Sequence, residues 1–343
     1  MEQQDILSMT LPELQVAVQE LGEPKFRAKQ IFNWLHQKRV TDFSEMTTLS
    51  LPFRERLASD FCINRLKIAK RLASSVDDTV KYLYELPDGN YVETVCMQYH
   101  HGTSLCISTQ VGCRMGCRFC ASAIAGFVRN LTPAEMLLQI YETERAQNCK
   151  ISSLVLMGIG EPLDNFDNVL RFLQLLSDPN GYGMSLRHVT VSTCGVVPKI
   201  LELAEQRLGL TLSVSLHCPN DAGRSAIMPI NRSYPIDVLL DACQTYFEKT
   251  GRRVTFEYAV MEQVNSAEQD AAALAERLKG LHAHVNLIPI NPVKERNFHT
   301  LKKTVLQFQK TLERYGIPAT IRRTLGSDIE AACGQLRRDA IQK

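Results

Sequence analysis

The 343-residue chain contains no apolar run approaching the roughly 20 residues that a membrane-spanning helix needs. Its first residues, Met1-Glu2-Gln3-Gln4-Asp5, are polar and acidic, and no apolar signal-peptide core follows them. The chain also lacks an internal repeat and a large net charge, since its formal charge is only +2. These absences lead us to expect a cytoplasmic protein that does not associate with a membrane and is not a repeat array.

The cysteines give little sign of a disulfide framework. Eleven cysteines, an odd number in a chain without a secretion signal, are better suited to a reducing cytoplasm, where thiols act as metal ligands, nucleophiles or packing groups. A second CxxC pair and an HxxxH motif, which structural zinc sites commonly use, are missing as well. Hydrophobic and charged contents of 45% and 22% are those of an ordinary globular protein.

Three cysteines do lie close together, in the run Cys113-Arg-Met-Gly-Cys117-Arg-Phe-Cys120. A cubane [4Fe–4S] cluster is usually held by four thiolates. Three thiolates therefore leave one iron open to a small molecule, to which the cluster can pass an electron. Spacing alone leaves a zinc site, or cysteines without a shared role, as alternative interpretations.

The hydrophobic pattern predicts the order of the elements. Spacing from Leu11 to Phe61 is helical, and Val80 to Val95 alternates as a β-hairpin does, with the turn Pro87-Asp88-Gly89-Asn90. After residue 100, strand-like and helical segments alternate, which predicts a parallel sheet with right-handed crossovers. The expected strands are Leu105–Gln110, Ser153–Gly158, His188–Thr193, Leu210–Leu216, Val254–Val260 and His284–Ile290.

Six such units predict an α/β fold with a partial (β/α)6 barrel. We expect an N-terminal helical accessory domain (1–78), a linking β-hairpin (79–98), the barrel core (99–328) and a C-terminal segment (329–343). Polar motifs follow several of the strands, among them Gly160-Glu161-Pro162, Ser192, His217 and Asn291. Because active sites of parallel barrels lie at the carboxyl ends of the strands, these residues should meet at one mouth.

The residues around the cysteine run resemble a known family. They read Leu105-Cys106-Ile107-Ser108-Thr109-Gln110-Val111-Gly112 before Cys113, and the chain closes with Asp328-Ile329-Glu330-Ala331-Ala332-Cys333-Gly334-Gln335. In these motifs the chain resembles the radical S-adenosylmethionine (SAM) enzymes, and more narrowly the RlmN/Cfr family of RNA adenosine methyltransferases, from about Pro24 to Gln335. The closing motif, with a cysteine seven residues before the run, is more selective than CxxxCxxC alone.

This resemblance implies a radical SAM barrel with a [4Fe–4S] cluster and SAM as cofactors. Cys113, Cys117 and Cys120 would ligate the cluster. A carboxylate at Glu161 suits the ammonium of SAM, and Gly160 would let the backbone approach the ligand closely. By the same resemblance, the SAM pocket is completed by Ser192, Ser215, Leu216, His217 and Asn291. For the polar strand-end residues, hydrogen bonding within the protein is the alternative interpretation.

The resemblance also implies the reaction. Cys333 would carry a methyl group taken from one SAM, and a second SAM in the same turnover would yield the radical that activates this methyl. The protein and RNA are then transiently joined, Glu93 acts as a base, and Cys106 releases the product by forming a disulfide with Cys333. Otherwise the cysteines would be packing residues and Glu93 a surface residue of a strand.

Charge supports an RNA partner. Eleven Lys and Arg stand against five Asp and Glu between Glu23 and Arg71, an excess of six positive charges that suits an RNA backbone but also fits a solvated surface. Arg322-Arg323 would extend a basic surface if it folded onto the same side.

The function that these features predict is RlmN-like methylation of adenosine C2 in 23S rRNA and tRNA. The alternatives are Cfr-like C8 methylation and a non-catalytic iron–sulfur or zinc RNA-binding protein. Expected partners are RNA and an electron donor such as flavodoxin or ferredoxin, and the expected oligomeric state is a monomer.

Overall fold

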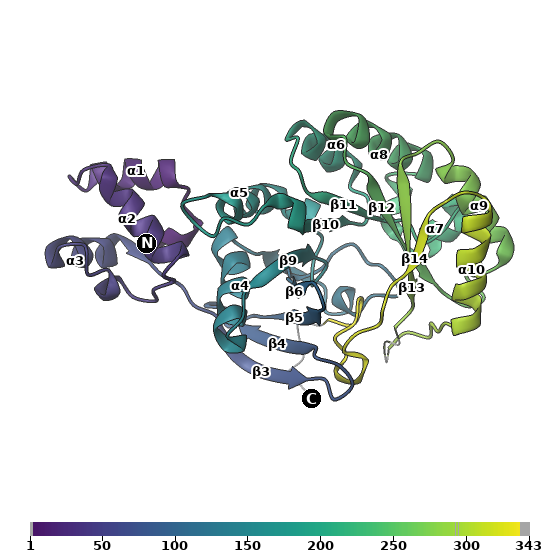
Figure 1. Cartoon of the computed structure of the whole chain (residues 1–343), viewed down its shortest axis with the longest axis horizontal. Coiled ribbons are helices and arrows are strands. Elements are labelled where there is room, and N and C mark those ends of the chain that lie inside the picture. The colour runs from purple at the N-terminus through teal and green to yellow at the C-terminus, as the bar shows by residue number, and fades with distance from the viewer. Residues whose placement is uncertain (1–2, 292, 294, 337–343) are drawn as a thin grey trace.

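The computed structural model describes residues 3–291, 293 and 295–336. One ten-stranded sheet runs through it in the order β14-β13-β12-β11-β10-β9-β6-β5-β4-β3 (Figure 1). Neighbouring strands from β6 to β14 are parallel, and the three at the other end are antiparallel. The parallel strands are β6 (Gly102–Cys106), β9 (Ile151–Leu156), β10 (Val189–Thr193), β11 (Thr211–Ser215), β12 (Val254–Val260), β13 (Ala283–Pro289) and β14 (Ala319–Ile321).

The predicted α/β partial barrel is confirmed. Helices α5, α6, α8, α9 and α10 lie along the outer face of the curved sheet (Figure 1). The α-helices of this part are α4 (Pro133–Gln147), α5 (Phe166–Ser177), α6 (Val197–Glu205), α7 (Asp221–Ile227), α8 (Ile236–Thr250), α9 (Glu268–Leu278) and α10 (Lys302–Arg314). Helix α4 begins with a capping box, in which the side chains of Thr132 and Glu135 each accept a hydrogen bond from the other residue's backbone N–H.

The predicted hairpin forms, but it belongs to the main sheet. Its strands β4 (Val80–Glu85) and β5 (Tyr91–Tyr99) continue the barrel sheet because β5 pairs antiparallel with β6. Residues 67–73, which we expected within the helical domain, form a further strand, β3 (Lys67–Ala73), at the sheet edge. Almost every residue of β3 is exposed, so the sequence carries no alternation to reveal it, and pairing with β4 decides its conformation.

The N-terminal unit consists of α1 (Leu11–Glu20), α2 (Phe26–His36) and α3 (Leu51–Asp60), with β1 (Gln4–Asp5) paired to β2 (Phe61–Cys62). It packs against α4 and α5. The imidazole of His36 lies 2.9 Å from the hydroxyl of Tyr141, and Arg171 forms an ion pair with Glu13. Buried residues of this unit and of the barrel form one continuous hydrophobic cluster. Removing the unit would therefore expose the buried face of α4, so functional tests require the full chain.

Short elements complete the fold. The strands β7 (Gln110–Gly112) and β8 (Phe127–Asn130) pair antiparallel. Single 3-10 turns are η1 (Ile6–Ser8), η2 (Phe43–Glu45), η3 (Ala121–Ala123), η4 (Pro162–Asn165), η5 (Leu186–His188), η6 (Pro229–Arg232) and η7 (Ser327–Ile329). Among the helices that the structure describes, none combines the length and the apolar character needed to cross a bilayer.

Candidate active site

The three clustered cysteines lie on a loop, residues 113–126, whose two ends are joined by the β7–β8 pair. Gly112 closes this loop with a φ of 75°, in the left-handed region that favours glycine. A Cβ atom at Gly112 would lie only 1.7 Å from the carbonyl oxygen of Gly126. The loop can therefore close only if residue 112 has no side chain.

Replacing Gly112 with Ala should open the base of the cysteine loop and lower the iron content of the purified protein severalfold. The added methyl group overlaps backbone, so the chain itself must move. Gly89→Ala is the matched control because Gly89 has a similar φ of 79° but no atom within 4 Å of its ideal Cβ position. Iron per chain and thermal unfolding should be measured for both variants. Equal iron content in both would show that the overlap at Gly112 is unimportant.

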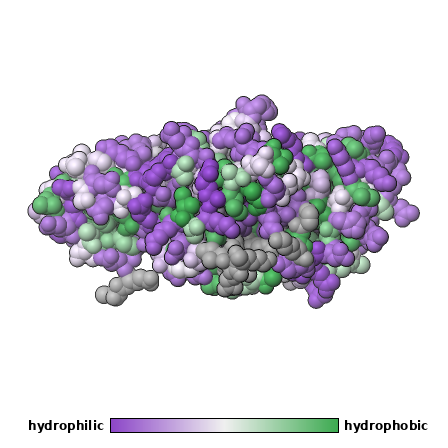
Figure 2. Space-filling model, turned by 90° about the horizontal axis from the view of Figure 1, so that it is seen from below, coloured by the Kyte–Doolittle hydropathy of each residue, from purple (hydrophilic) through white to green (hydrophobic). Residues whose placement is uncertain are grey.

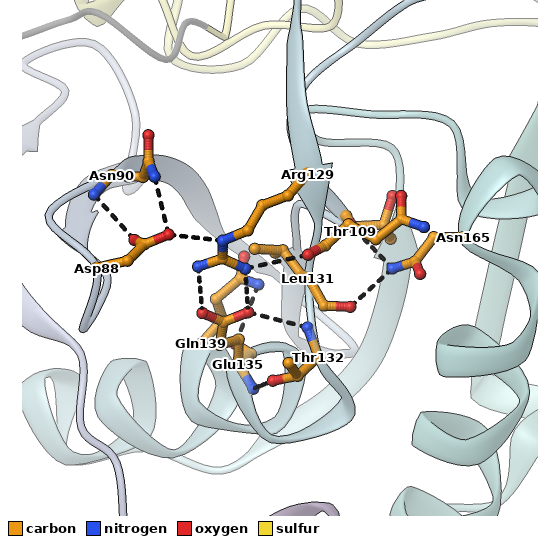
Figure 3. A network of polar contacts seen from close by, with 10 residues as sticks. Asp88, Asn90, Thr109, Arg129, Leu131, Thr132, Glu135, Gln139 and Asn165 are labelled. Atoms are coloured by element: carbon orange, nitrogen blue, oxygen red, sulfur yellow. Dashed lines mark hydrogen bonds and ion pairs between the residues drawn. The ribbon is translucent and has the colours of Figure 1, made fainter. Parts of the chain in front are cut away.

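A polar network anchors this loop to three other parts of the fold (Figure 3). Arg129 on β8 donates hydrogen bonds of 2.6 Å to Asp88 in the β4–β5 turn and of 2.7 and 2.8 Å to Glu135 on α4. Asn165 donates 2.8 Å hydrogen bonds to the carbonyls of Thr109 and Leu131, which lie just outside β7 and β8. The contact of Arg129 with Glu135 is a charge-assisted, bidentate pair largely shielded from solvent, since the Glu135 side chain is only 6% exposed. The base of the loop is therefore held in a fixed place relative to the barrel.

A cavity of about 930 Å³ lies at the carboxyl ends of the parallel strands. It brings together nine of the thirteen site residues predicted from the sequence, as the strand-end argument requires. These are Cys113, Cys117, Cys120, Gly160, Glu161, Ser192, Ser215, His217 and Cys333. We call it the first cavity.

The thiols of this cavity are suited to a cluster. Burial raises the pKa of the Cys113 thiol to about 12 and also raises the pKa of the Cys117 thiol well above its usual value, so iron binding must displace a proton from each. Each thiolate of a [4Fe–4S] cluster binds a different iron, so the three sulfurs need to surround a space and not converge on one point. In the described part of the chain, no three His, Cys, Asp or Glu side chains converge as a site for a metal ion.

Glu161 is buried at the wall of the first cavity. Its carboxylate accepts hydrogen bonds from the backbone N–H groups of Cys194 at 2.7 Å and Leu163 at 3.0 Å. Burial raises the pKa of this carboxyl group, and the two hydrogen bonds act in the opposite direction. We expected glycine at position 160 because it would let the backbone approach the ligand closely. The structure gives a different reason, since a Cβ atom at position 160 would lie 2.6 Å from the Cβ of Gln110. Glycine is therefore required by protein packing at this position.

His217 enters the first cavity as a neutral hydrogen-bond donor. Its Nδ1 accepts a hydrogen bond from the backbone N–H of Ala259 at 2.9 Å, which assigns the proton to Nε2. Burial lowers the pKa of the imidazole to about 3. Its neighbour Leu216, by contrast, does not line the cavity, since its side chain is buried in the hydrophobic core.

Arg224, which the sequence analysis did not single out, fixes the strand ends beneath His217. Its fully buried guanidinium donates to the carbonyls of Cys194, Ser215 and Leu216 at 2.6, 3.1 and 3.2 Å. These carbonyls follow β10 and β11, so Arg224 joins the two strand ends that face the cavity. Nothing in a single sequence distinguishes this arginine from a surface residue.

A second cavity, of about 550 Å³, adjoins the first. Cys106, the last residue of β6, lies on its wall together with Asn291, and Cys333 lines both cavities. Both reactive-cysteine candidates are free thiols. Burial, and then the nearby Cys333 thiol, raise the pKa of Cys106 to about 12. Asn291 does not line the first cavity; its side-chain amide donates to the carbonyl of Cys333 at 3.1 Å.

Hydrogen bonds hold the segment that carries Cys333 on both sides of this residue. Asp328 accepts hydrogen bonds from the hydroxyl of Ser74 at 2.7 Å and the backbone N–H of Ser75 at 2.8 Å, beside the β3–β4 turn. On the other side, the carbonyl of Gly334 accepts from the N–H of Ala121 in the cysteine loop at 2.7 Å. These contacts place Cys333 next to the three clustered cysteines. Residues 337–343 of the expected C-terminal segment lie outside the described residues.

Glu93 is buried, so the alternative interpretation that it is a surface residue of a strand is wrong. It is 1% exposed, and its carboxylate pairs with the ammonium of Lys81 at 2.9 Å. Lys81 also donates to the carbonyl of Glu330, in the Cys333 segment. Because side chains alternate along a strand, Glu93 shares its face of β5 with Val95 and Met97, which line the second cavity. Glu93 itself is not among the lining residues of either cavity.

Two further charged residues lie at the cavities. Arg322 lines both, and its guanidinium is 3.6 Å from the carboxylate of Glu257, which lines the first. The condition under which the Arg322-Arg323 pair would extend a basic surface is therefore not met by Arg322, although Arg323 is exposed. The oxygen of Glu257 that faces Arg322 is Oε2, and it is buried without a hydrogen-bond partner in the described part of the molecule, whereas Oε1 accepts from Ser213 and Asn286. This Oε2 atom is an acceptor that a ligand with N–H or O–H groups can fill.

Comparisons with known proteins cover the whole chain. Residues 4–63 match the Ribosomal RNA large subunit methyltransferase N-terminal domain, and residues 107–275 match the Radical SAM superfamily. The chain is 50% identical to the probable dual-specificity RNA methyltransferase RlmN of Lachnoclostridium phytofermentans, across 100% of this chain and 96% of that relative. It is also 50% identical to the protein of the same name from Alkaliphilus oremlandii, across the full length of both.

A solved structure is similar over nearly its whole length. It is a radical SAM methyltransferase from Sphaerobacter thermophilus, with a TM-score of 0.94 and 40% identity, covering 98% of this chain and 100% of that one.

Proposed function

Because the chain belongs to the RlmN family of radical SAM RNA methyltransferases, we propose that it methylates C2 of an adenosine in 23S rRNA and also acts on tRNA. Family membership makes the chain an enzyme, which replaces the alternative of a non-catalytic iron–sulfur or zinc protein. The dual specificity in the names of the relatives supports two RNA substrates. One structural observation carries the proposal: Cys333 lies on both cavities, between the clustered cysteines and Cys106.

The first cavity fits the two cofactors of this superfamily. Cys113, Cys117 and Cys120 would hold the [4Fe–4S] cluster, which, when bound, supplies the electron that cleaves SAM. The Glu161 carboxylate would accept from the SAM ammonium, and the Nε2–H of His217 is available as a donor. The buried Oε2 of Glu257 supplies a further acceptor for a ligand that carries hydroxyl and ammonium groups.

The chain's own residues would then act in sequence. The Cys333 thiolate attacks the methyl carbon of one SAM, forming an S–C bond as the sulfonium S–C bond breaks. One hydrogen atom would then leave this methyl group to the radical that a second SAM supplies in the same turnover. The remaining methylene carbon would bond to C2 of the adenine, joining Cys333 to RNA, and the adduct would return one electron to the cluster. Glu93 would remove the ring proton once the Cys333 segment, with its link to Lys81, shifts. The Cys106 thiolate would then attack the Cys333 sulfur and form a disulfide, which cellular thiols reduce. The carbon would leave the sulfur with the bonding electron pair and take up a proton, which completes the methyl group on the adenine.

The position of the new methyl group is tested by nucleoside analysis. RNA treated with reduced, cluster-loaded enzyme and SAM should yield 2-methyladenosine after complete digestion. Mass spectrometry with 2-methyladenosine and 8-methyladenosine as standards identifies the product. Finding 8-methyladenosine would establish the Cfr-like alternative, and finding neither would contradict the proposed function. Parallel reactions with 23S rRNA fragments and with tRNA test the dual specificity.

RNA would be bound partly by exposed cations of the N-terminal unit. Lys25 and Lys29 are exposed, whereas Arg39 pairs with Glu144 and the exposed Arg65 lies 3.9 Å from the carboxylate of Glu142. Lys67, Lys70 and Arg71 lie on β3, where lysine also protects an exposed sheet edge. Hydrophilic residues cover most of the face seen in Figure 2, with apolar residues gathered near its middle.

Reversing the charges of Lys25 and Lys29 to Glu should weaken RNA binding and lower the slope of log affinity against log salt by about 1 for each lysine, as expected for lost phosphate contacts. The matched control reverses Lys302 and Lys303, which are exposed at the start of α10 on the barrel. Titration of labelled RNA at several salt concentrations measures both effects. If the two double variants had equal slopes of log affinity against log salt, the excess positive charge of the N-terminal unit would belong to a solvated surface and not to an RNA contact.

The remaining parts of the proposal concern partners and location. We propose flavodoxin or ferredoxin as electron donor, a monomer in solution and action in the cytoplasm, where ribosomes and tRNA are modified. Light scattering of the cluster-loaded protein tests the monomer, and reduction assays with each purified donor test the electron source.

A further inference from the structure

Lys81 is buried, although lysine is rarely buried in proteins unless it is paired. It lies on β4, and its side chain is only 7% exposed. Its ammonium contacts two acceptors, each at 2.9 Å: the carboxylate oxygen Oε1 of Glu93 and the backbone carbonyl of Glu330. Because water is excluded from this contact, the charges of the two side chains depend on each other more strongly than those of a surface ion pair.

The pairing of β4 with β5 brings these groups together. Lys81 lies opposite Val95, and Glu93 lies opposite Leu83, so Lys81 and Glu93 are diagonal neighbours on one face of the sheet. The Cys333 segment covers this face beside the β3–β4 turn (Figure 1), and Ala331 of this segment packs in one buried cluster with Val95. The ion pair is therefore enclosed between the sheet and the segment that carries Cys333.

The other titratable groups around this ion pair lie nearer to solvent or farther along the sheet. In the described part of the chain, Asp328 of the covering segment is exposed and accepts hydrogen bonds from the β3–β4 turn. The strands contribute to the same face the buried Cys106 and four side chains that solvent reaches at least in part: Lys67, Lys70, Glu85 and Tyr91. Lys81 is thus the lysine of β3 and β4 whose ammonium reaches the carboxylate.

Burial makes the charge of Glu93 sensitive to this contact. A carboxyl group removed from water favours its neutral form, whereas an ammonium at hydrogen-bond distance favours the charged form. In the proposed function Glu93 takes a proton from the adenine ring, and only the carboxylate can accept it. The ammonium of Lys81 therefore favours the form of Glu93 that can act as a base.

We propose that Lys81 is a positioning residue for the proton-transfer step. Its ammonium keeps Glu93 ionised, and its hydrogen bond to the carbonyl of Glu330 sets the place of this carboxylate relative to Cys333, three residues farther along the chain. Lys81 lines neither cavity, so it acts through Glu93. The inference rests on the proposed function, in which Glu93 is the base, and assigns that base a partner.

The first test measures the charge of Glu93 without RNA, in the full-length, cluster-loaded protein. Lys81→Met keeps an unbranched side chain but removes the charge, so the buried carboxyl group should hold its proton more tightly in the folded protein than in the unfolded chain. Such a group contributes stability that is lost as the pH rises. The melting temperature of Lys81→Met should therefore fall, relative to that of the wild type, from about pH 5 to pH 8. Lys81→Met combined with Glu93→Gln should lack this pH dependence.

Two further variants complete the unfolding comparison. Lys249→Met is the matched control because Lys249 forms its ion pair with Glu205 at the protein surface, where solvent screens the two charges. It should follow the wild type at every pH, and so should Lys81→Arg, which keeps the positive charge. If the melting temperatures of Lys81→Met and Lys249→Met changed with pH in the same way, the proposal would be overturned.

The second test follows a single turnover with RNA. At pH 7 Lys81→Met should still accept a methyl group on Cys333 and bond to RNA, but the covalent complex should accumulate because the ring proton stays in place. The pH at which release of methylated RNA reaches half of its maximal rate should rise by about 1–3 units, the range over which a nearby opposite charge shifts a carboxyl group. Lys81→Arg should restore the wild-type profile. A loss of rate that is equal at every pH would indicate a purely structural role and contradict the proposal.

Glu93→Gln separates the proposal from its premise. If the wild type methylates RNA and Glu93→Gln does so at the same rate, Glu93 is not the base and the role of Lys81 fails with it. If the wild type leaves RNA unmodified, the proposed function itself fails, and the unfolding comparison shows separately whether Lys81 keeps Glu93 ionised. Lys81→Gln, which keeps a donor for the carbonyl of Glu330 without a charge, replaces Lys81→Met if the latter is not folded, and the same pH shifts are expected.

Discussion

Replacing Cys106 with Ala should make the enzyme accumulate as a covalent complex with RNA, whereas Cys333→Ala should form none. In the first variant Cys333 still accepts a methyl group and bonds to the adenine, but no thiolate is available to attack its sulfur. In the second variant the methyl acceptor itself is missing. Each variant is expressed in cells and purified under denaturing conditions. A gel shift and an increased ratio of absorbance at 260 to 280 nm, both removed by ribonuclease, reveal the complex.

Cys243→Ala is the control for this comparison because Cys243 is a buried packing residue of α8 outside both cavities. It should lower stability by about 1 kcal/mol or less and form no lasting complex. The absence of a complex with Cys106→Ala, or an equal complex with Cys333→Ala, would show that the assigned order of the two cysteines is wrong.

Replacing Cys117 with Ala should remove most of the iron and all RNA methylation. Cys117 lies on the wall of the first cavity with Cys113 and Cys120, and two thiolates leave a second iron without a protein ligand. The protein should remain folded because the loop is held at its base by the Arg129 network and by the β7–β8 pair. Iron and sulfide analysis after anaerobic reconstitution, with the visible absorption spectrum, measures the loss.

Cys149→Ala provides the matched control, since Cys149 is also partly buried but lines neither cavity. It should bind about four irons per chain, as the wild type should. A normal cluster spectrum in Cys117→Ala would contradict the ligand assignment.

The barrel could be predicted because its strands are strongly apolar and alternate with helices. The strand-end rule then placed Glu161, Ser192 and His217 at one mouth, and the structure brings their side chains to one cavity. The first strand is shifted, since β6 ends at Cys106 and not at Gln110. Cys106 therefore lies at the carboxyl end of a strand as well. The predicted strand, Leu105–Gln110, had placed Cys106 near its amino end.

Elements that depend on tertiary contacts could not be predicted. Strand β14 has only three residues, too few to produce a pattern, so nothing in the sequence placed Arg322, which follows it directly, at a strand end. Had β14 been recognised, the same strand-end rule would have placed Arg322 at the mouth. Glu93 was open to interpretation as a surface residue because the pairing that buries β5 between β4 and β6 cannot be read from its own residues.

The most direct test of the central claim follows the carbon of the methyl group through Cys333. Enzyme carrying a ¹³C-methyl group on Cys333, prepared in cells supplied with labelled methionine and confirmed by peptide mass spectrometry, is mixed with RNA, reductant and unlabelled SAM for a single turnover. The account predicts that the first methylated adenosine carries ¹³C and that the label disappears from Cys333. Unlabelled methyladenosine, formed while the label stays on Cys333, would contradict it.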